Sequence, residues 1–303
     1  MRQIRSRREF LKTTLAVTGA AMMSSTLNTF ARPRYADKVQ VSGHLWVYAS
    51  RYPPNWDCTP ILDQVFSDFK YAGMDGLELM DINLRHDDAV QRLKELVSKY
   101  KLPITGTSYS ANMWKQEEYN KILEDVEFVL ERLHQVGGNI FGISVGSATR
   151  MKTEQELDAQ ADVLKKIMKA CDKHNIQPNL HNHTYEVEND LHDLKGTLKR
   201  IPEIKLGPDL NWLVRGGVDP VWFIKNYGKQ LVYMHIRDQQ AGGKWTEAVG
   251  DGAMDFTAIA KALHEINYSG RAAIELAFDG PPVNEVKESW KKSRAYVKKV
   301  FGW

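Results

Sequence analysis

Short apolar runs alternate with longer amphipathic segments from residue 40 to the end of the chain. The short runs have the length and the β-branched content of strands. The segments between them repeat apolar residues at helical spacing, as Ile61, Val65, Phe69 and Ala72 do. The pattern predicts eight strands with helices between them, and the strands are Gln40–Tyr48, Gly76–Met80, Pro103–Tyr109, Asn139–Val145, Ile176–His183, Lys205–Leu210, Leu231–Ile236 and Arg271–Ala277.

Regular alternation of strands and helices is typical of βα units on a parallel sheet, and eight strands is the number that closes a barrel. We therefore predict a single-domain (β/α)₈ TIM barrel over residues 32–303. An open doubly wound sheet is the alternative, but it would carry a glycine-rich phosphate loop after an early strand. The first predicted strand is followed instead by the aromatic segment Ala49–Trp56.

Helix boundaries are marked by capping residues. Thr59-Pro60 predicts the start of the first helix, and Thr153 with Glu156 three residues later forms a capping-box pattern. Glycines supply the predicted helix ends, at Gly73, Gly137-Gly138 and Gly228.

The N-terminus predicts an export signal. Arg7 and Arg8 stand in the run Ser6–Lys12, which has the twin-arginine pattern, and the mildly apolar run Thr13–Met23 follows. A basic amphipathic helix is disfavoured because Thr13–Phe30 contains no charge. We expect a signal peptide over residues 1–31, cleavage after Ala31 and a periplasmic mature protein.

The predicted signal carries five basic residues and one acid, so its removal changes the formal net charge from +3 to −1. No basic stripe remains that would indicate a nucleic-acid partner. Beyond the signal no apolar run approaches the ~18 residues of a membrane span, so we expect no membrane association after processing. Cys58 and Cys171 do not suggest a disulfide framework. The sequence leaves open whether the protein forms a homo-oligomer.

Metal-binding side chains gather at the ends of the last four predicted strands, which is the rim where TIM barrels carry their chemistry. Any one of these residues could be structural, a satisfied core histidine or a helix cap. Four consecutive strands that end alike indicate a shared cation, since charged residues are rarely buried without a partner. Mixed imidazole and carboxylate ligands suit Mn²⁺, Co²⁺, Zn²⁺ or Fe²⁺ better than Ca²⁺. The strand ends are Leu180–His183, Gly207–Trp212, Tyr233–Asp238 and Ala273–Leu276.

Six short motifs in this order resemble the sugar phosphate isomerase/epimerase family, which has the xylose-isomerase-like TIM barrel. They are Ala72–Leu79, His181-Asn182-His183, Pro208-Asp209, His235–Asp238, Val249–Phe256 and Ile274-Glu275. The resemblance covers the mature chain. It implies one divalent metal ion, and the ligands it implies are His181, Asp209, His235 and Glu275.

The resemblance also implies a proton-transfer role for Glu275 as general base. Many members place a second glutamate where this chain has His181, and an imidazole bound to a metal cannot also take a proton. The partner must then come from elsewhere. His183 shares the face of His181, and Glu186 is the second candidate. The alternatives are that His183 only orients a ligand and that Glu186 lies in a solvated loop.

Members with His-Asn-His and an export signal are similar to enzymes that act on 3-keto-glycosides. We expect a metal-dependent sugar isomerase or epimerase that abstracts the proton next to a carbonyl through an enediolate or enolate. The alternatives are a 3-keto-glycoside lyase or hydratase that works by β-elimination, and a non-catalytic sugar-binding barrel. A DNA-repair endonuclease is disfavoured, because the early strands offer only His44 and Glu78 as further ligands.

The substrate is expected to be a small carbohydrate. Arg237 and Glu78 stand at strand ends where they could meet its hydroxyl groups. Indole and phenol rings near strand ends could stack on a pyranose, and we expect two or three of them to do so. Trp46, Tyr109 and Trp212 are the first candidates, and the others are Tyr48, Trp114 and Trp245.

Overall fold

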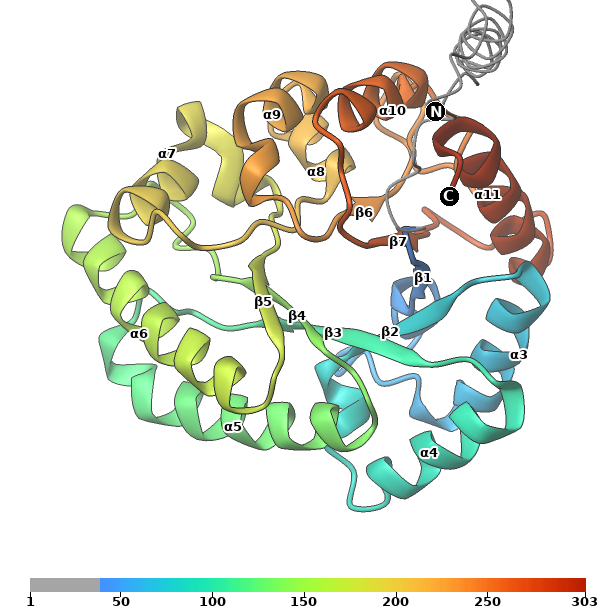
Figure 1. Cartoon of the computed structure of the whole chain (residues 1–303), viewed down its shortest axis with the longest axis horizontal. Helices are drawn as coiled ribbons and strands as arrows, with labels where there is room; N and C mark the ends of the chain where they lie inside the picture. Colours follow the sequence, from blue (N-terminus) through green and yellow to red (C-terminus); the bar gives the residue numbers. More distant parts are fainter. Residues whose placement is uncertain (1–38) are drawn as a thin grey trace, which may run out of the picture. The chain divides into compact units, whose positions relative to one another are not determined.

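The computed structural model describes residues 39–303, and the predicted signal peptide lies outside this range. Strands form the centre and helices surround them (Figure 1). The strands pair in parallel in the order β5-β4-β3-β2-β1-β7-β6. Their bounds are β1 Val41–His44, β2 Gly76–Met80, β3 Ile104–Ser110, β4 Ile140–Ser144, β5 Gln177–Leu180, β6 His235–Ile236 and β7 Ala272–Glu275.

Helices follow the strands around the ring (Figure 1). The α-helices are α2 Trp46–Ala49, α3 Leu62–Ala72, α4 Ala89–Tyr100, α5 Tyr119–Gln135, α6 Glu154–Lys173, α7 Thr184–Arg200, α8 Leu210–Arg215, α9 Pro220–Tyr227, α10 Phe256–Glu265 and α11 Val286–Phe301. Short 3₁₀ helices are η1 Thr59–Ile61, η2 Asp81–Leu84, η3 Gln116–Glu118 and η4 Gly228–Gln230.

The barrel is closed by the predicted strand Lys205–Leu210, which pairs through single bridges. Leu206 bridges in parallel to Leu180 of β5 and to Leu231, and Asp209 bridges to His235 of β6. Pro208 has no N–H to donate to a neighbouring strand, so the ladder is interrupted here. The predicted (β/α)₈ barrel is confirmed, with one of its eight strands reduced to bridges.

The first strand is shorter than predicted, because the chain turns into α2 after His44. Nδ1 of His44 accepts the backbone N–H of Trp46 at 3.2 Å and so stabilises the turn. Tyr48, expected at the mouth, is instead buried in the core, where its hydroxyl donates to Asp68 at 2.7 Å and accepts from Trp290 at 3.0 Å.

The capping predictions have mixed outcomes. The Thr153 and Glu156 capping box is present at the start of α6, and Gly73 ends α3 with a φ of 75°. The predicted cap at Thr59 is wrong. Thr59 is the first residue of η1, and its N–H donates to the side chain of Asp57 at 2.9 Å.

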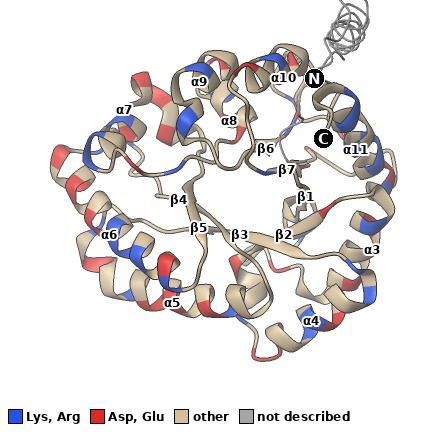
Figure 2. Cartoon of the chain, in the orientation of Figure 1, with Lys and Arg blue, Asp and Glu red and all other residues tan. Residues whose placement is uncertain are grey.

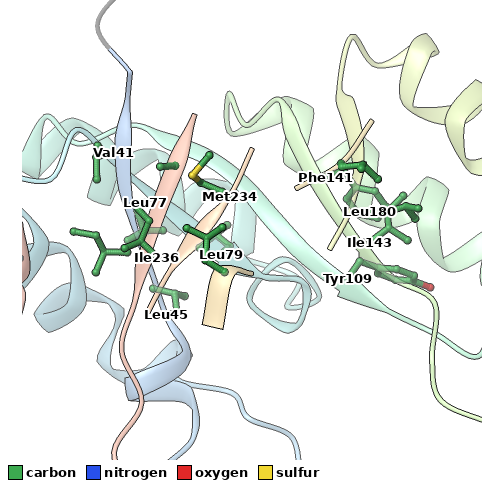
Figure 3. Close-up of a cluster of buried hydrophobic side chains, with 14 of the residues drawn as sticks. Val41, Leu45, Leu77, Leu79, Tyr109, Phe141, Ile143, Leu180, Met234 and Ile236 are labelled. Atoms are coloured by element: carbon green, nitrogen blue, oxygen red, sulfur yellow. The ribbon is translucent and has the colours of Figure 1, made fainter. Parts of the chain in front are cut away.

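Alternation along the strands separates an apolar shell from a polar interior. Leu77 and Leu79 of β2 belong to the large hydrophobic core, whereas Glu78 between them hydrogen-bonds His235 across the barrel at 2.8 Å. Figure 3 shows Leu77, Leu79, Met234 and Ile236 gathered together and a second group around Phe141. The core therefore lies between strands and helices, and the barrel interior is free for polar groups.

Charged residues lie mainly on the surrounding helices, where both signs are interspersed (Figure 2). No helix among residues 39–303 combines the length and the apolar character that crossing a bilayer requires. Cys58 and Cys171 are both buried free thiols. The sequence did not suggest a disulfide between them.

A buried ion pair joins the loop before α6 to α7. Lys152 Nζ lies 2.6 Å from Asp193 Oδ2 and donates to Gln160 Oε1 at 2.6 Å. Gln160 in turn donates to Asp193 Oδ1 at 2.7 Å. The side chains of Lys152 and Asp193 are only 2% and 8% exposed, so water cannot replace a lost partner.

Substitution Lys152→Ala is expected to lower the free energy of unfolding by about 3–5 kcal/mol, because it leaves the Asp193 carboxylate buried and unpaired. Urea denaturation measures this change. Lys165→Ala, at an exposed lysine of the following helix α6, is the control and should change stability by less than about 0.5 kcal/mol. Equal effects of the two variants would contradict the prediction.

Candidate active site

Three predicted metal ligands meet at the carboxyl end of the barrel. His181 follows β5, Asp209 follows the bridged strand and His235 lies in β6. One ligand atom from each lies within 4.8 Å of the other two. Parallel strands end at the same rim, which is why residues 54 positions apart in the chain are neighbours here.

Asp209 is held by the helix that it caps. Its Oδ1 accepts the backbone N–H groups of Asn211 at 2.8 Å and Trp212 at 3.0 Å at the start of α8. Asn182 fixes the backbone from the other side, since its Oδ1 accepts the N–H of Asp209 at 3.2 Å. Asp209 Oδ2 is buried and has no hydrogen-bond partner among the described residues. One carboxylate oxygen of Asp209 is therefore held by the helix, and the other makes no hydrogen bond with a described residue and lies 3.5 Å from Arg237.

His235 is oriented by Glu78. Its Nε2 lies 2.8 Å from Glu78 Oε2, which also accepts the hydroxyl of Tyr233 at 2.9 Å. Its Nδ1 faces the rim, 2.7 Å from Glu275 Oε2, and makes no hydrogen bond of good geometry with any described residue. A carboxylate behind one ring nitrogen is the arrangement that orients metal-ligating histidines.

The residues present fit a divalent cation. Two buried ligand atoms, Asp209 Oδ2 and His235 Nδ1, make no hydrogen bond with the described residues, and both are of a kind that binds a cation. Burial and the neighbouring His235 lower the pKa of His181 well below its usual value, so its imidazole is neutral and its lone pair can bind a metal. Two imidazoles and one carboxylate suit a transition metal or zinc.

Glu275, the fourth predicted ligand, lies at the end of β7 beside this group. Its Oε1 contacts the guanidinium of Arg237, and its Oε2 lies 2.7 Å from His235 Nδ1 and 3.7 Å from His44 Nδ1. Arg237 also lies 3.5 Å from Asp209 Oδ2. The pairing with Arg237 stabilises the ionised form of Glu275, which is the form that can accept a proton or bind a cation.

A cavity of about 430 Å³ opens above these residues. Arg237 forms part of its wall and lies over the ring of Trp245, 4.8 Å from the ring centroid, and over that of Trp212 at 5.5 Å. The volume is within the range of small-molecule sites. Residues that line it include His44, Trp46, Tyr109, Ser144, His181, His183, Trp212, His235, Trp245 and Glu275.

The comparisons with known proteins agree with the barrel fold. A family model described as the xylose isomerase-like TIM barrel matches residues 66–300. The chain belongs to the xylose isomerase-like TIM barrel family. The resemblance seen in the sequence is thereby confirmed.

Relatives of this barrel family include enzymes that act on sugars and cyclitols. The chain is 24% identical over 278 residues to an inosose dehydratase of Clostridium beijerinckii, covering 80% of this chain and 90% of the relative. A solved sugar phosphate isomerase/epimerase from Parabacteroides distasonis has a TM-score of 0.70 and 19% identity, covering 86% of this chain and 93% of the other. The 3-keto-D-glucoside 4-epimerase of E. coli has a TM-score of 0.68 and 17% identity, covering 86% and 100%.

The barrel places the predicted substrate-binding residues at different depths. Trp46, Trp212 and Arg237 line the cavity. Tyr109 contributes to the wall, but its hydroxyl donates to Asp125 of α5 at 2.9 Å. Glu78 does not line the cavity, since it is 1% exposed and lies behind His235.

Of the two candidate partners for Glu275, His183 reaches the cavity. Its Nδ1 lies 3.1 Å from Ser144 Oγ, and its ring stacks on Tyr185 with 5.4 Å between centroids. Burial lowers the pKa of His183 to about 4, so the imidazole is neutral at pH 7. It can accept a hydrogen bond from a sugar or take up a proton.

Glu186 is buried and does not line the cavity, so its interpretation as solvated loop is wrong. Its Oε2 accepts the backbone N–H of His183 at 2.7 Å, and its Oε1 accepts the Ser144 hydroxyl at 2.6 Å. The Glu186 carboxyl group thus caps α7 and fixes the backbone of His183. Ser144, the last residue of β4, was missed in the sequence, because a serine at a strand end gives no signal.

Burial raises the pKa of Glu186 to about 7. The folded protein keeps this proton at pH values where the unfolded chain, with a pKa near 4.5, has released it. Stability should therefore fall as the pH rises from about 4.5 to 7, by roughly 3 kcal/mol from this group. Urea denaturation across this range should show a flatter profile for Glu186→Gln. An unchanged slope in the variant would count against the prediction.

Proposed function

We propose that the protein removes the proton next to the ketone of a 3-keto-glycoside and eliminates the substituent at carbon one. The observation that carries the proposal is the Glu275 side chain in the cavity wall, in contact with Arg237 and beside the group His181, Asp209 and His235. Such an arrangement would put a base and a cation on one side of a sugar in the cavity.

His181, Asp209 and His235 would hold the divalent cation, with Glu275 close enough to join them. When bound, the cation would supply Lewis acidity that stabilises negative charge on a substrate oxygen. Glu78 would keep His235 in position through its Nε2, and Asn182 would keep Asp209 in place.

Proton transfer would use Glu275. The C2–H bond is acidified by the ketone at carbon three, and its proton passes to the carboxylate of Glu275. The electron pair moves toward the ketone and then expels the substituent from carbon one, which leaves a double bond between carbons one and two. The departing oxygen takes up a proton from water, and Glu275 returns its proton to water, which restores the carboxylate. Arg237 holds Glu275 ionised before the transfer, and Trp212 and Trp46 offer faces for the sugar ring.

The number of free carboxylates that line the cavity favours elimination over epimerisation. Glu275 has no second glutamate opposite it, because His181 occupies that strand end. The other lining acid, Asp81, is paired with Arg85 at 2.5 Å. Epimerisation by two facing carboxylates would need a second free one, so an epimerase of this chain would have to use His183. The name of the dehydratase relative also describes an elimination.

The test is a reaction in deuterated water with methyl 3-keto-β-glucoside and with glucose as the unoxidised comparison. Elimination predicts stoichiometric release of methanol from the keto-glycoside alone, followed by NMR. Deuterium at a ring carbon without methanol release would select the epimerase. Binding without either change would leave a sugar-binding barrel and overturn the proposal.

We further propose that residues 1–31 direct the protein to the periplasm by the twin-arginine route. The motif around Arg7 and Arg8 supports this proposal. Expression of the full chain with Arg7→Lys and Arg8→Lys together should retain the uncleaved protein in the cytoplasm. Normal export of that variant, judged by cell fractionation, would exclude the route.

A further inference from the structure

A second hollow of about 580 Å³, here called the rim groove, lies beside the cavity. One wall is formed by Val47, Ser50 and Arg51 after β1, and the other by residues 278–286 after β7. β1 and β7 are paired in parallel, with His44 opposite Glu275 at their carboxyl ends. Both walls therefore rise from the rim where these two cavity residues stand.

Two connections join the rim groove to the cavity. Val47 in its wall directly follows Trp46, which lines the cavity. Asp279 on the opposite wall accepts the backbone N–H of Trp245, another cavity residue, at 2.8 Å. The groove therefore borders the cavity at both of its walls.

The groove offers unpaired hydrogen-bonding groups. Within residues 39–303, the guanidinium of Arg51 makes neither a hydrogen bond nor an ion pair. Asp279 uses one carboxylate oxygen for Trp245 and has the other free in the same range. Phe278 adds a half-buried apolar face. Donors, acceptors and one aromatic face together are the groups that bind sugar hydroxyls and C–H faces.

The charges in the groove favour a neutral ligand. Arg51 shares the groove with Asp279 and with Glu285, and Glu285 is paired with Lys287 at 2.6 Å, so the groove has no excess of positive charge for an anionic group. A plain aromatic ring would leave the polar groups without partners.

We propose that the rim groove binds a second, neutral sugar ring attached to carbon one of the reacting sugar, and that Arg51 determines this specificity. The inference rests on the proposed function and narrows its substrate class to oxidised disaccharides. Free monosaccharides and methyl glycosides would fill the cavity and leave the groove empty.

The experiment compares kcat/KM on 3-keto-cellobiose oxidised in the non-reducing ring, on phenyl 3-keto-β-glucoside and on methyl 3-keto-β-glucoside. The wild type should prefer the disaccharide to the methyl glycoside by about tenfold or more, the effect of a few hydrogen bonds that include a charged donor. Arg51→Ala should remove this preference, mainly through KM, with methyl glycoside turnover unchanged. Arg92→Ala, on α4, is the matched control and should retain the preference.

The two proposals fail in different ways. Turnover of all three substrates at one rate, or a preference that Arg51→Ala leaves intact, would overturn the rim-groove inference and leave the elimination standing. A preference for the phenyl glycoside over the disaccharide would also overturn it, in favour of an aromatic occupant. If the wild type turns over none of the three substrates, both the rim-groove inference and the proposed elimination are overturned.

Discussion

Substitution of Glu275 by glutamine is expected to lower kcat on a 3-keto-glucoside by about 10²- to 10⁴-fold. Glutamine keeps the size of the side chain and a hydrogen bond to Arg237, but its amide cannot accept the proton from carbon two. The loss should appear in kcat and also in the exchange of that proton with deuterated water. Stopped assays and NMR measure the two quantities separately.

The control for this variant is Glu203→Gln, which makes the same chemical change at an exposed position. It should have wild-type kinetics. If Glu275→Gln retains full proton exchange, Glu275 is not the base, and His183, the other cavity residue able to take up a proton, becomes the candidate. A His183→Gln variant would then be the one to lose exchange.

Removal of divalent metal by a chelator is expected to abolish turnover, and re-addition of Mn²⁺, Co²⁺, Zn²⁺ or Fe²⁺ should restore it. The cation should also stabilise the folded protein by about 2.7 kcal/mol at a hundredfold excess over its Kd. The physical reason is the pair of buried acceptors, Asp209 Oδ2 and His235 Nδ1, that have no hydrogen bond in the described chain. Elemental analysis and thermal unfolding measure the metal content and the stability.

Two variants sharpen the metal prediction. Asp209→Asn keeps an oxygen to cap α8 but removes the charge, so it should lose metal while the helix stays in place. Glu78→Gln weakens only the support of His235 and should reduce the affinity by roughly 10- to 100-fold. Full activity of metal-free wild-type protein would contradict the whole assignment of this group.

The repeating strand and helix pattern determined most of the fold. Apolar runs such as Gly76–Met80 were predicted to the residue, since a buried parallel strand has few polar positions and a clear beginning. The first strand was predicted too long, because apolar residues 45–49 read alike in a strand and in a short helix. The strand ends at a turn in which the His44 side chain accepts the N–H of Trp46, a contact that hydrophobic periodicity does not reveal.

The candidate active site, like the fold, was determined partly by the sequence and partly by the tertiary structure. The sequence by itself determined which strand ends carry imidazoles and carboxylates, because period-two alternation and barrel order fix the rim on which His181, Asp209, His235 and Glu275 stand. Only the tertiary structure decided the roles of the residues around this group. Glu186 caps a helix and Glu78 supports His235, and the rim groove forms between loops about 230 residues apart in the chain. Such roles depend on distances between elements, and sequence spacing does not contain those distances.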